Sequence, residues 1–281
     1  MLGAIIGDIV GSRFEWHNHR SKDFELFHKS CFATDDSIMT LAIAQAILDS
    51  DKDASVLGKR AVERMQELGR EYPDAGYGGR FSWWLTEENP KPYGSWGNGS
   101  AMRVSACAFA ATTLEEAKEY SKRVTEVTHN HPEGLKGAEA TTVAIFMAKT
   151  GHSLDEIREV ILRDYYKINF TLDEIRPTYR FNESCQDTVP QALEAFFEAT
   201  SFEDAIRNAI SVGGDSDTLA AITGGIAEAY FGIPDDIRKK ALTYLDDFQK
   251  GILFAFESKY GDFVPGISSG TSSQGLRPIS N

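Results

Sequence analysis

The sequence predicts an all-α fold that forms a single compact multi-helix domain. Apolar residues recur with helical spacing along most of the 281 residues, helix-capping patterns precede several of these runs, and the alternating β-branched runs that indicate strands are nearly absent. The length alone allows one large domain or two small ones. We expect one domain over residues 1–262, followed by a flexible tail over 263–281, where Ser, Gly and Thr are frequent and apolar residues are few.

The expected helices follow from local patterns. The stretch 38–48 is apolar nearly all round, with Thr40 and Gln45 as its only polar members, which indicates a buried central helix. The stretch 217–231 is rich in Ala and Gly, which let neighbouring helices approach closely, so we expect it to be central too. Further helices are expected over 54–70, 115–127, 134–149, 154–165, 187–199, 203–211 and 235–257. Capping-box patterns occur at Thr113 to Glu116, Ser153 to Glu156 and Thr171 to Glu174, and a looser version occurs at Ser201 to Asp204.

The segment 71–103 is the longest part of the sequence without helical periodicity. It interleaves aromatic residues with glycines, which argues against disorder, and long glycine-rich loops in compact domains are usually functional or disordered. Gly94, Gly97 and Gly99 would let the backbone pass close to a diphosphate and point N–H groups at it. Tight turns explain the same glycines. Tyr93 and Trp96 would stack on a base or a sugar, or would simply anchor the loop.

Two acidic clusters lie far apart in the sequence, Thr34-Asp35-Asp36-Ser37 and Asp215-Ser216-Asp217-Thr218, and Gly213-Gly214 precedes the second. Each cluster stands at the start of an apolar helical run, and carboxylates with hydroxyls are the ligands that Mg²⁺ and Mn²⁺ prefer. Four carboxylates in one buried place need cations to neutralise them, so we expect two metal ions at these helix N-termini if the fold joins the clusters. Asp, Ser and Thr are also favoured helix N-caps, which is the alternative interpretation.

Other polar residues are candidates for the same site. Asp8 and Glu15 are seven residues apart, so they share a face if this part of the chain is helical, and either would be able to join the metals. His129 and His131 lack a third ligand nearby for zinc, so contact of a single histidine with a ligand is the better interpretation. A surface turn remains the simplest alternative for this pair.

Composition excludes several classes of protein. The net charge of −13, from 42 acidic and 29 basic residues, argues against a nucleic-acid partner, which would require a basic face. The three cysteines are widely spaced and odd in number, which indicates reduced thiols and a cytoplasmic location. No signal peptide and no apolar run long enough to cross a bilayer are evident, so we expect no membrane partner.

Taken together, these motifs resemble those of the ADP-ribosylglycohydrolase family, in the order in which the family has them, over nearly the whole chain to about Pro234. The matching residues are Gly7-Asp8 with Glu15, Thr34-Asp35-Asp36-Ser37, Gly94 to Arg103, Thr128-His129 and Gly213 to Thr218. The resemblance implies an all-α fold of that type and a centre of two divalent metal ions, Mg²⁺ or Mn²⁺. It also implies hydrolysis of the bond between the ribose of ADP-ribose and an acceptor.

The resemblance assigns roles to residues of this chain. The implied metal ligands are Thr34, Asp35, Asp36, Asp215, Asp217 and Thr218, with Asp217 as the bridge. The implied substrate-binding residues are Gly94, Ser95, Trp96, Asn98, Gly99, Ser100 and His129. The implied catalytic residues are Asp36 and Glu15, together with Asp74, which resembles an acidic residue that orients guanidinium in arginine-specific members.

We therefore expect a metal-dependent hydrolase of ADP-ribosylated arginine on protein. A hydrolase of another ADP-ribosyl or N-ribosyl small molecule is the first alternative, because the sequence does not fix the acceptor. A non-catalytic ADP-ribose-binding or structural protein is the second alternative, but such a protein has no need to keep clustered acids that are costly to bury. The oligomeric state is left open.

Overall fold

The computed structural model describes residues 1–261, and all regular secondary structure in this range is helical. An isolated bridge between Gly97 and Ser184 is the nearest approach to a strand within these residues. The predicted all-α class is therefore confirmed, whereas the whole of the tail predicted over 263–281 and the domain boundary itself lie outside the described residues. In chain order the elements are α1 (Leu2–Gly11), η1 (Ser12–Phe14), α2 (Asp35–Ser50), α3 (Ala54–Glu71), α4 (Gly79–Thr86), η2 (Asn98–Ser100), α5 (Ser105–Ala110), α6 (Leu114–Thr125), α7 (Pro132–Lys149), α8 (Leu154–Asp164), α9 (Leu172–Ile175), α10 (Cys185–Phe197), α11 (Phe202–Ser211), α12 (Ser216–Phe231), α13 (Asp235–Ala241), η3 (Leu242–Tyr244) and α14 (Asp247–Tyr260).

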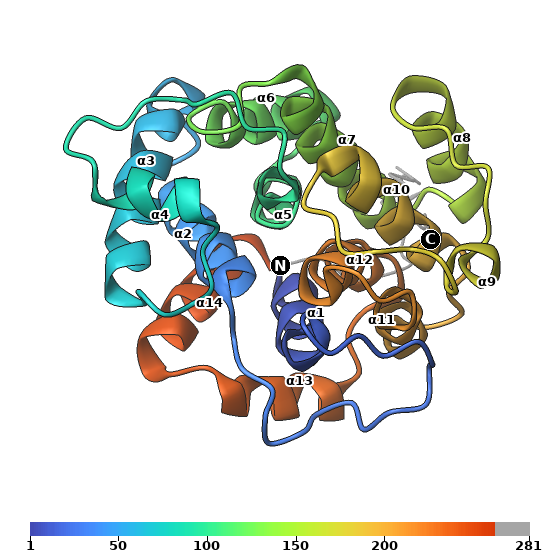
Figure 1. Cartoon of the computed structure of the whole chain (residues 1–281). Coiled ribbons are helices and arrows are strands. Elements are labelled where there is room, and N and C mark those ends of the chain that lie inside the picture. The colour runs from blue at the N-terminus through green and yellow to red at the C-terminus, as the bar shows by residue number, and fades with distance from the viewer. Residues whose placement is uncertain (262–281) are drawn as a thin grey trace, which may run out of the picture.

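Helices α1 and α12 pack directly on each other and lie at the centre of the helices in Figure 1. Their backbones approach closely because glycines occupy the contact. A Cβ atom on Gly7 would lie 1.9 Å from the carbonyl oxygen of Ala220, and one on Gly3 would lie 2.2 Å from that of Gly224. No other residue type fits at these positions without moving one helix away from the other.

The same packing positions the N-terminus of α12 beside the C-terminal end of α1. A Cβ atom on Gly11 would lie 2.5 Å from the Cα atom of Asp217, which belongs to the first turn of α12. Helix α2 also packs against α1 and α12. Three buried helices, two of which contribute an N-terminus, thus meet where the acidic clusters lie.

The two helices predicted to be central, 38–48 and 217–231, form parts of α2 and α12 and are largely buried, so this prediction is confirmed. The capping boxes at Ser153 and Thr171 form in full, with each cap side chain and each glutamate bonding the other residue's backbone. Thr113 and Ser201 also accept the expected bond from the backbone three residues on.

The expectations about helices differ from the structure at several places. Helix α4 lies inside the segment 71–103, which was expected to lack helix; α5 was not expected, and α1 was considered only as the case in which the chain around Asp8 is helical. The stretch 235–257 is not one helix, because the 3₁₀ turn of η3 ends the first part and Asp246 starts α14 by accepting a bond from the backbone N–H of Gln249. A helix that begins with its own capping box does not continue the preceding one.

Among residues 1–261, none of the helices has both the length and the apolar character that a membrane span requires. Cys31, Cys107 and Cys185 are all buried free thiols.

Candidate functional site

A cavity of about 730 Å³ opens where the N-termini of α2 and α12 face the glycine-rich segment. It brings together most of the residues predicted to form the site, namely Glu15, Asp35, Asp36, Gly94, Ser95, Trp96, Asn98, Gly99, His129, Asp215, Asp217 and Thr218. Three other predicted residues, Thr34, Asp74 and Ser100, are not among those that line it. Segments that are more than 180 residues apart in the sequence therefore share one wall.

The carboxylates form two overlapping groups. One oxygen each of Asp8, Asp36 and Asp217 lie within 4.8 Å of one another, and the same holds for Glu15, Asp215 and Asp217. Asp217 belongs to both groups, which is the arrangement that a bridging ligand would have. Because Asp36 and Asp217 lie in the first turns of α2 and α12, the positive ends of both helix dipoles favour their ionised forms.

Asp8 organises the turn that begins α2. Its carboxylate accepts bonds from the backbone N–H of Thr34 at 2.9 Å, the Thr34 hydroxyl at 2.6 Å, the backbone N–H of Ser37 at 3.1 Å and the Ser37 hydroxyl. Burial raises the pKa of Asp8 to about 6, and these bonds oppose that rise. Since both oxygens are already engaged, Asp8 supports the turn on which Asp35 and Asp36 stand.

Asp36 fits the role of a cation ligand. Its Oδ2 atom accepts a bond from the Thr218 hydroxyl at 3.1 Å, but its Oδ1 atom is buried and has no hydrogen-bond partner in the structure. A buried carboxylate oxygen without a partner is costly, and a bound cation would remove that cost. Asp215 is also held in place, because the side-chain amide of Asn98 donates to its Oδ2 atom at 2.7 Å.

The carboxylates repel one another. Burial, followed by the charges of Asp8 and Asp215, raises the pKa of Asp35 to about 8. Burial and neighbouring carboxylates also raise the pKa of Asp36 and Asp217 well above the usual range. These carboxylates cannot all be ionised at the same time unless positive charge lies between them. Their oxygen-only donor set suits a hard divalent cation such as Mg²⁺ or Mn²⁺.

Glu15 lies at the edge of this cluster and is partly exposed. Burial and the charge of Asp215 raise the pKa of Glu15 to about 7. Asn18 fixes the backbone near it, because its amide donates to the carbonyl oxygens of Glu15 and Gly214 and accepts from the N–H of Gly214 at 2.9 Å. Gly213 and Gly214 both have φ near +75°, so glycine is required in this turn before Asp215.

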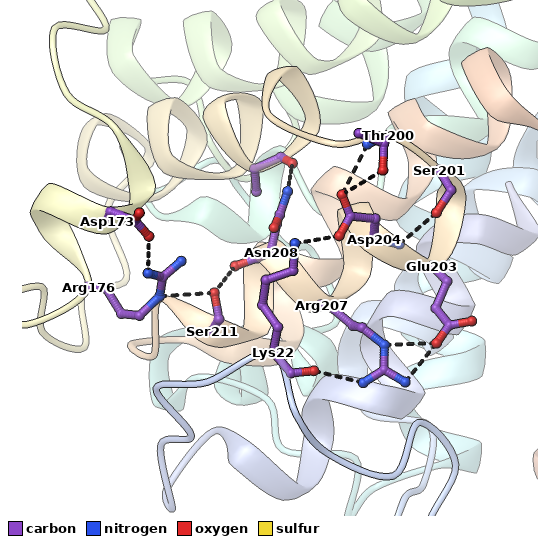
Figure 2. Close-up of polar contacts among 11 residues, drawn as sticks. Lys22, Asp173, Arg176, Thr200, Ser201, Glu203, Asp204, Arg207, Asn208 and Ser211 are labelled. Atoms are coloured by element: carbon purple, nitrogen blue, oxygen red, sulfur yellow. Dashed lines mark hydrogen bonds and ion pairs between the residues drawn. The ribbon is translucent and has the colours of Figure 1, made fainter.

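The segment that follows Glu15 is anchored along its length. The Arg20 guanidinium donates to the carbonyl oxygens of Val212 at 2.8 Å and Tyr179 at 2.6 Å, and also to that of Arg176. Figure 2 shows the next contacts, where Lys22 pairs with Asp204 and Arg207 donates to the carbonyl oxygen of Lys22 at 2.8 Å. Glu15 is therefore carried by a segment tied to α11 and to the turn before Asp215.

The glycine-rich segment is an ordered loop, and the chain near Ser184 supports it. The backbone N–H of Asn98 donates to the carbonyl oxygen of Glu183 at 2.7 Å, and that of Cys185 donates to the carbonyl oxygen of Trp96 at 2.9 Å. The buried Ser100 hydroxyl donates to the carbonyl oxygen of Gly97 at 3.0 Å, so it holds the loop on the side away from solvent.

Several residues that line the cavity carry no motif in the sequence. Trp16 and Phe181 stack with ring centroids 5.1 Å apart and line the cavity. Their exposed fractions are 72% and 37%. No sequence pattern marks either residue as part of the site. Gly76 to Phe81, which belong to the segment 71–103 and run into α4, also line the cavity, as do Asn182 to Ser184 before α10, which no motif predicted.

The structure separates the roles of the two histidines. His129 is buried and lines the cavity. His131 instead caps α7, because its Nδ1 atom accepts from the backbone N–H of Glu133 at 3.1 Å.

Asp74 is exposed in the loop between α3 and α4. The next residue, Ala75, accepts the backbone N–H of Asp35 at 2.8 Å, and Gly76 lines the cavity, so the Asp74 loop lies against the acidic cluster.

Comparisons with known proteins agree on one family. The ADP-ribosylglycohydrolase family profile matches residues 1–258. The human ADP-ribosylhydrolase ARH3 is 25% identical, with 83% of this chain and 84% of that protein covered. The ADP-ribosylarginine hydrolase Tri1 of Pseudomonas putida is 26% identical, with 83% of this chain and 70% of that protein covered. The ADP-ribosyl-dinitrogen reductase glycohydrolase of Rhodospirillum rubrum is 26% identical, with 87% and 88% covered.

A solved structure described as an ADP-ribosylglycohydrolase-related protein complex has the same fold. Its TM-score is 0.66 at 22% identity, with 92% of this chain and 95% of that chain covered. The match of the family profile over nearly all of the described residues decides the assignment. The chain belongs to the ADP-ribosylglycohydrolase family of enzymes.

Proposed function

We propose that this protein hydrolyses the glycosidic bond between ADP-ribose and an acceptor, with two divalent metal ions, Mg²⁺ or Mn²⁺, and with ADP-ribosylated arginine on protein as the substrate. The observation that carries the proposal is that one cavity holds both the carboxylate cluster and the glycine-rich loop. A diphosphate suits the backbone N–H groups of such a loop, and the ribose would then lie toward the carboxylates. The names of the three relatives support ADP-ribose as the common group.

Asp36 and Asp217 would be central ligands, together with Asp35, Asp215, Thr218 and Thr34. When bound, the metal ions would orient the ribose hydroxyls and polarise water. Asp8 would keep the turn at Thr34 in place, and Asn98 would orient Asp215. The chain thus supplies a prearranged set of oxygens rather than a flexible one.

When the acceptor departs, positive charge develops on the ribose ring, and a nearby carboxylate stabilises that charge. Glu15 or Asp36 would accept a proton from the attacking water or pass one to the leaving group. In the metal-free protein, burial and the charge of Asp215 raise the pKa of Glu15 to about 7, and bound metal ions would lower it toward the ionised form. Gly94, Ser95, Trp96, Gly99 and Ser100 would bind or support the diphosphate side, and His129 would contact the ligand.

Asp74 would face the acceptor and pair with its guanidinium. The name of the Pseudomonas putida relative supports arginine as the acceptor. The alternative acceptors are serine on protein and a small molecule that carries ADP-ribose or another N-ribosyl group. We place the enzyme in the cytoplasm, where its three buried free thiols would stay reduced.

The test compares release of ADP-ribose from arginine-linked protein, serine-linked protein and a small ADP-ribosyl compound, each with added Mg²⁺ or Mn²⁺ and after exhaustive chelation. We expect turnover of the arginine-linked substrate that chelation abolishes and added metal restores. Turnover that survives chelation would refute the metal requirement. Preference for another substrate would move the proposal to that acceptor, and no turnover of any of them would favour a binding protein.

A further inference from the structure

Arg103, Thr128 and His129 form a line of polar groups behind the glycine-rich loop. The Nη2 atom of Arg103 donates to the Thr128 hydroxyl oxygen at 2.7 Å, and that oxygen lies 2.7 Å from the Nδ1 atom of His129. All three residues are buried, with exposed fractions of 1% for Arg103 and 5% for His129. Within residues 1–261, no carboxylate forms an ion pair with Arg103.

The direction of the hydrogen bonds follows from the chemistry of the three groups. A guanidinium only donates, so the Thr128 oxygen is the acceptor in its contact with Arg103. The hydroxyl proton of Thr128 is then free to go either to His129 Nδ1 at 2.7 Å or to the carbonyl oxygen of Thr125 at 3.5 Å. The shorter distance is that of a well-formed hydroxyl bond and the longer one is that of a weak bond. The distances therefore favour donation from Thr128 to Nδ1, with Nδ1 unprotonated.

A neutral imidazole with an unprotonated Nδ1 carries its proton on Nε2. The Nε2 atom faces the glycine-rich loop, because a Cβ atom on Gly97 or Gly99 would lie 3.5 or 3.6 Å from it. His129 also lines the cavity. The Nε2–H group is thus presented to the space above the loop, where an oxygen of a ligand would accept it.

We propose that Arg103 and Thr128 are positioning residues that hold His129 as the neutral tautomer with its proton on Nε2, ready to donate to a ligand oxygen at the glycine-rich loop. The ligand, an ADP-ribosyl group, rests on the proposed function, but the tautomer does not. The electrostatics agree, because burial and the nearby Arg103 charge lower the pKa of His129 well below the usual range. The ring then stays neutral at physiological pH.

The ring nitrogen signals of ¹⁵N-histidine-labelled, Mg²⁺-loaded protein test this directly, since the two tautomers and the imidazolium give different patterns. Without ligand at neutral pH, we expect His129 to show a protonated Nε2 and an unprotonated Nδ1. A protonated Nδ1, or a charged ring, would overturn the proposal. The measurement does not depend on catalysis, so it remains decisive even if ADP-ribose is not the ligand.

Thr128→Val removes the hydroxyl and keeps the shape, so the preference for the Nε2 tautomer should weaken. Thr125→Val is the matched control, because Thr125 is equally buried nearby and its hydroxyl has no hydrogen-bond partner in the structure. Thr128→Ser should keep the wild-type pattern, which separates loss of the hydroxyl from loss of packing. An unchanged tautomer in a folded Thr128→Val protein would refute the role of Thr128.

Calorimetric titration with free ADP-ribose tests the donor role. Loss of one well-oriented hydrogen bond to a charged ligand should weaken binding about tenfold in Thr128→Val, with the Thr125→Val and Thr128→Ser proteins near wild type. Equal affinity in all four proteins, with the tautomer shifted, would overturn the donor role. Absence of ADP-ribose binding in the wild-type protein would instead refute the proposed function.

Discussion

Thr218 donates its hydroxyl proton to Oδ2 of Asp36 at 3.1 Å, although the two residues are 182 positions apart in the chain. The bond joins the first turn of α12 to the first turn of α2. It leaves the second oxygen of Asp36 buried without a partner. The bond thus joins two distant helices at a carboxylate that still lacks a partner for its second oxygen.

Asp36→Asn should stabilise the metal-free protein while it abolishes metal binding. The substitution replaces a carboxyl whose ionised form is disfavoured by burial and by the charges of Asp35 and Asp8. Relief of about 1 kcal/mol would raise Tm by roughly 2–4 °C in a domain of this size. Calorimetric melting in a chelator, with and without excess Mg²⁺, measures both effects. Asp236→Asn, at an exposed position, is the control and should change neither. A lower Tm for metal-free Asp36→Asn would contradict the repulsion.

The metal-free protein should lose stability as the pH rises from about 4 to about 8. The pKa values of Asp8, Glu15 and Asp35 in the folded protein are raised to about 6, 7 and 8, so in this window the folded state binds protons that the unfolded state has released. Stability therefore falls with rising pH. Bound metal should reduce this dependence of the stability on pH. We expect the Tm difference between Mg²⁺-loaded and chelated protein to widen steadily across the window, and a constant difference would count against the shifted carboxylates.

Arg20→Lys should lower kcat while free ADP-ribose binds nearly as before. One ammonium group cannot reach the carbonyl oxygens of Arg176, Tyr179 and Val212 together. The segment that carries Glu15 would then shift relative to the turn before Asp215. Misplacement of Glu15 should lower kcat about tenfold or more. Arg207→Lys is the matched control, because Arg207 holds the same segment farther along, at Lys22 and Phe24. Equal losses in both variants would indicate general loosening instead of placement of Glu15.

Asp74→Asn should slow hydrolysis of arginine-linked ADP-ribose by an order of magnitude or more, because a carboxylate pairs with a guanidinium in a two-point geometry that the amide cannot match. Metal content and ADP-ribose affinity should stay at the wild-type level. Glu71→Gln removes another exposed charge at the end of α3 and should have no effect. Full activity of Asp74→Asn on the arginine substrate would refute the proposed contact between Asp74 and the acceptor.

The sequence predicted those parts of the fold that have local signals. Ser153 and Thr171 marked helix starts, and the uncharged run after Asp36 marked a central helix. Helix α1 was missed because Gly3, Gly7 and Gly11 lower helix propensity, and only the packing on α12 explains them.

The site was predictable as far as its residues belong to motifs. The two acidic clusters and the glycine-rich loop line one cavity. The contributions of Trp16 and Phe181 depend on tertiary contact between segments 165 positions apart, counted from 16 to 181, and neither residue carries a local signal. The anchoring of Glu15 by Asn18 and Arg20 was hidden for the same reason.

We propose that the carboxylate cluster binds two metal ions beside a loop that binds diphosphate. A crystal structure with Mn²⁺ and ADP-ribose, with anomalous differences collected at the manganese edge, tests it most directly. We expect two anomalous peaks, both in contact with Asp217 and one of them with Asp36, and a diphosphate against the backbone of Gly94 to Gly99. A single peak, a peak elsewhere, or ADP-ribose outside this cavity would contradict it.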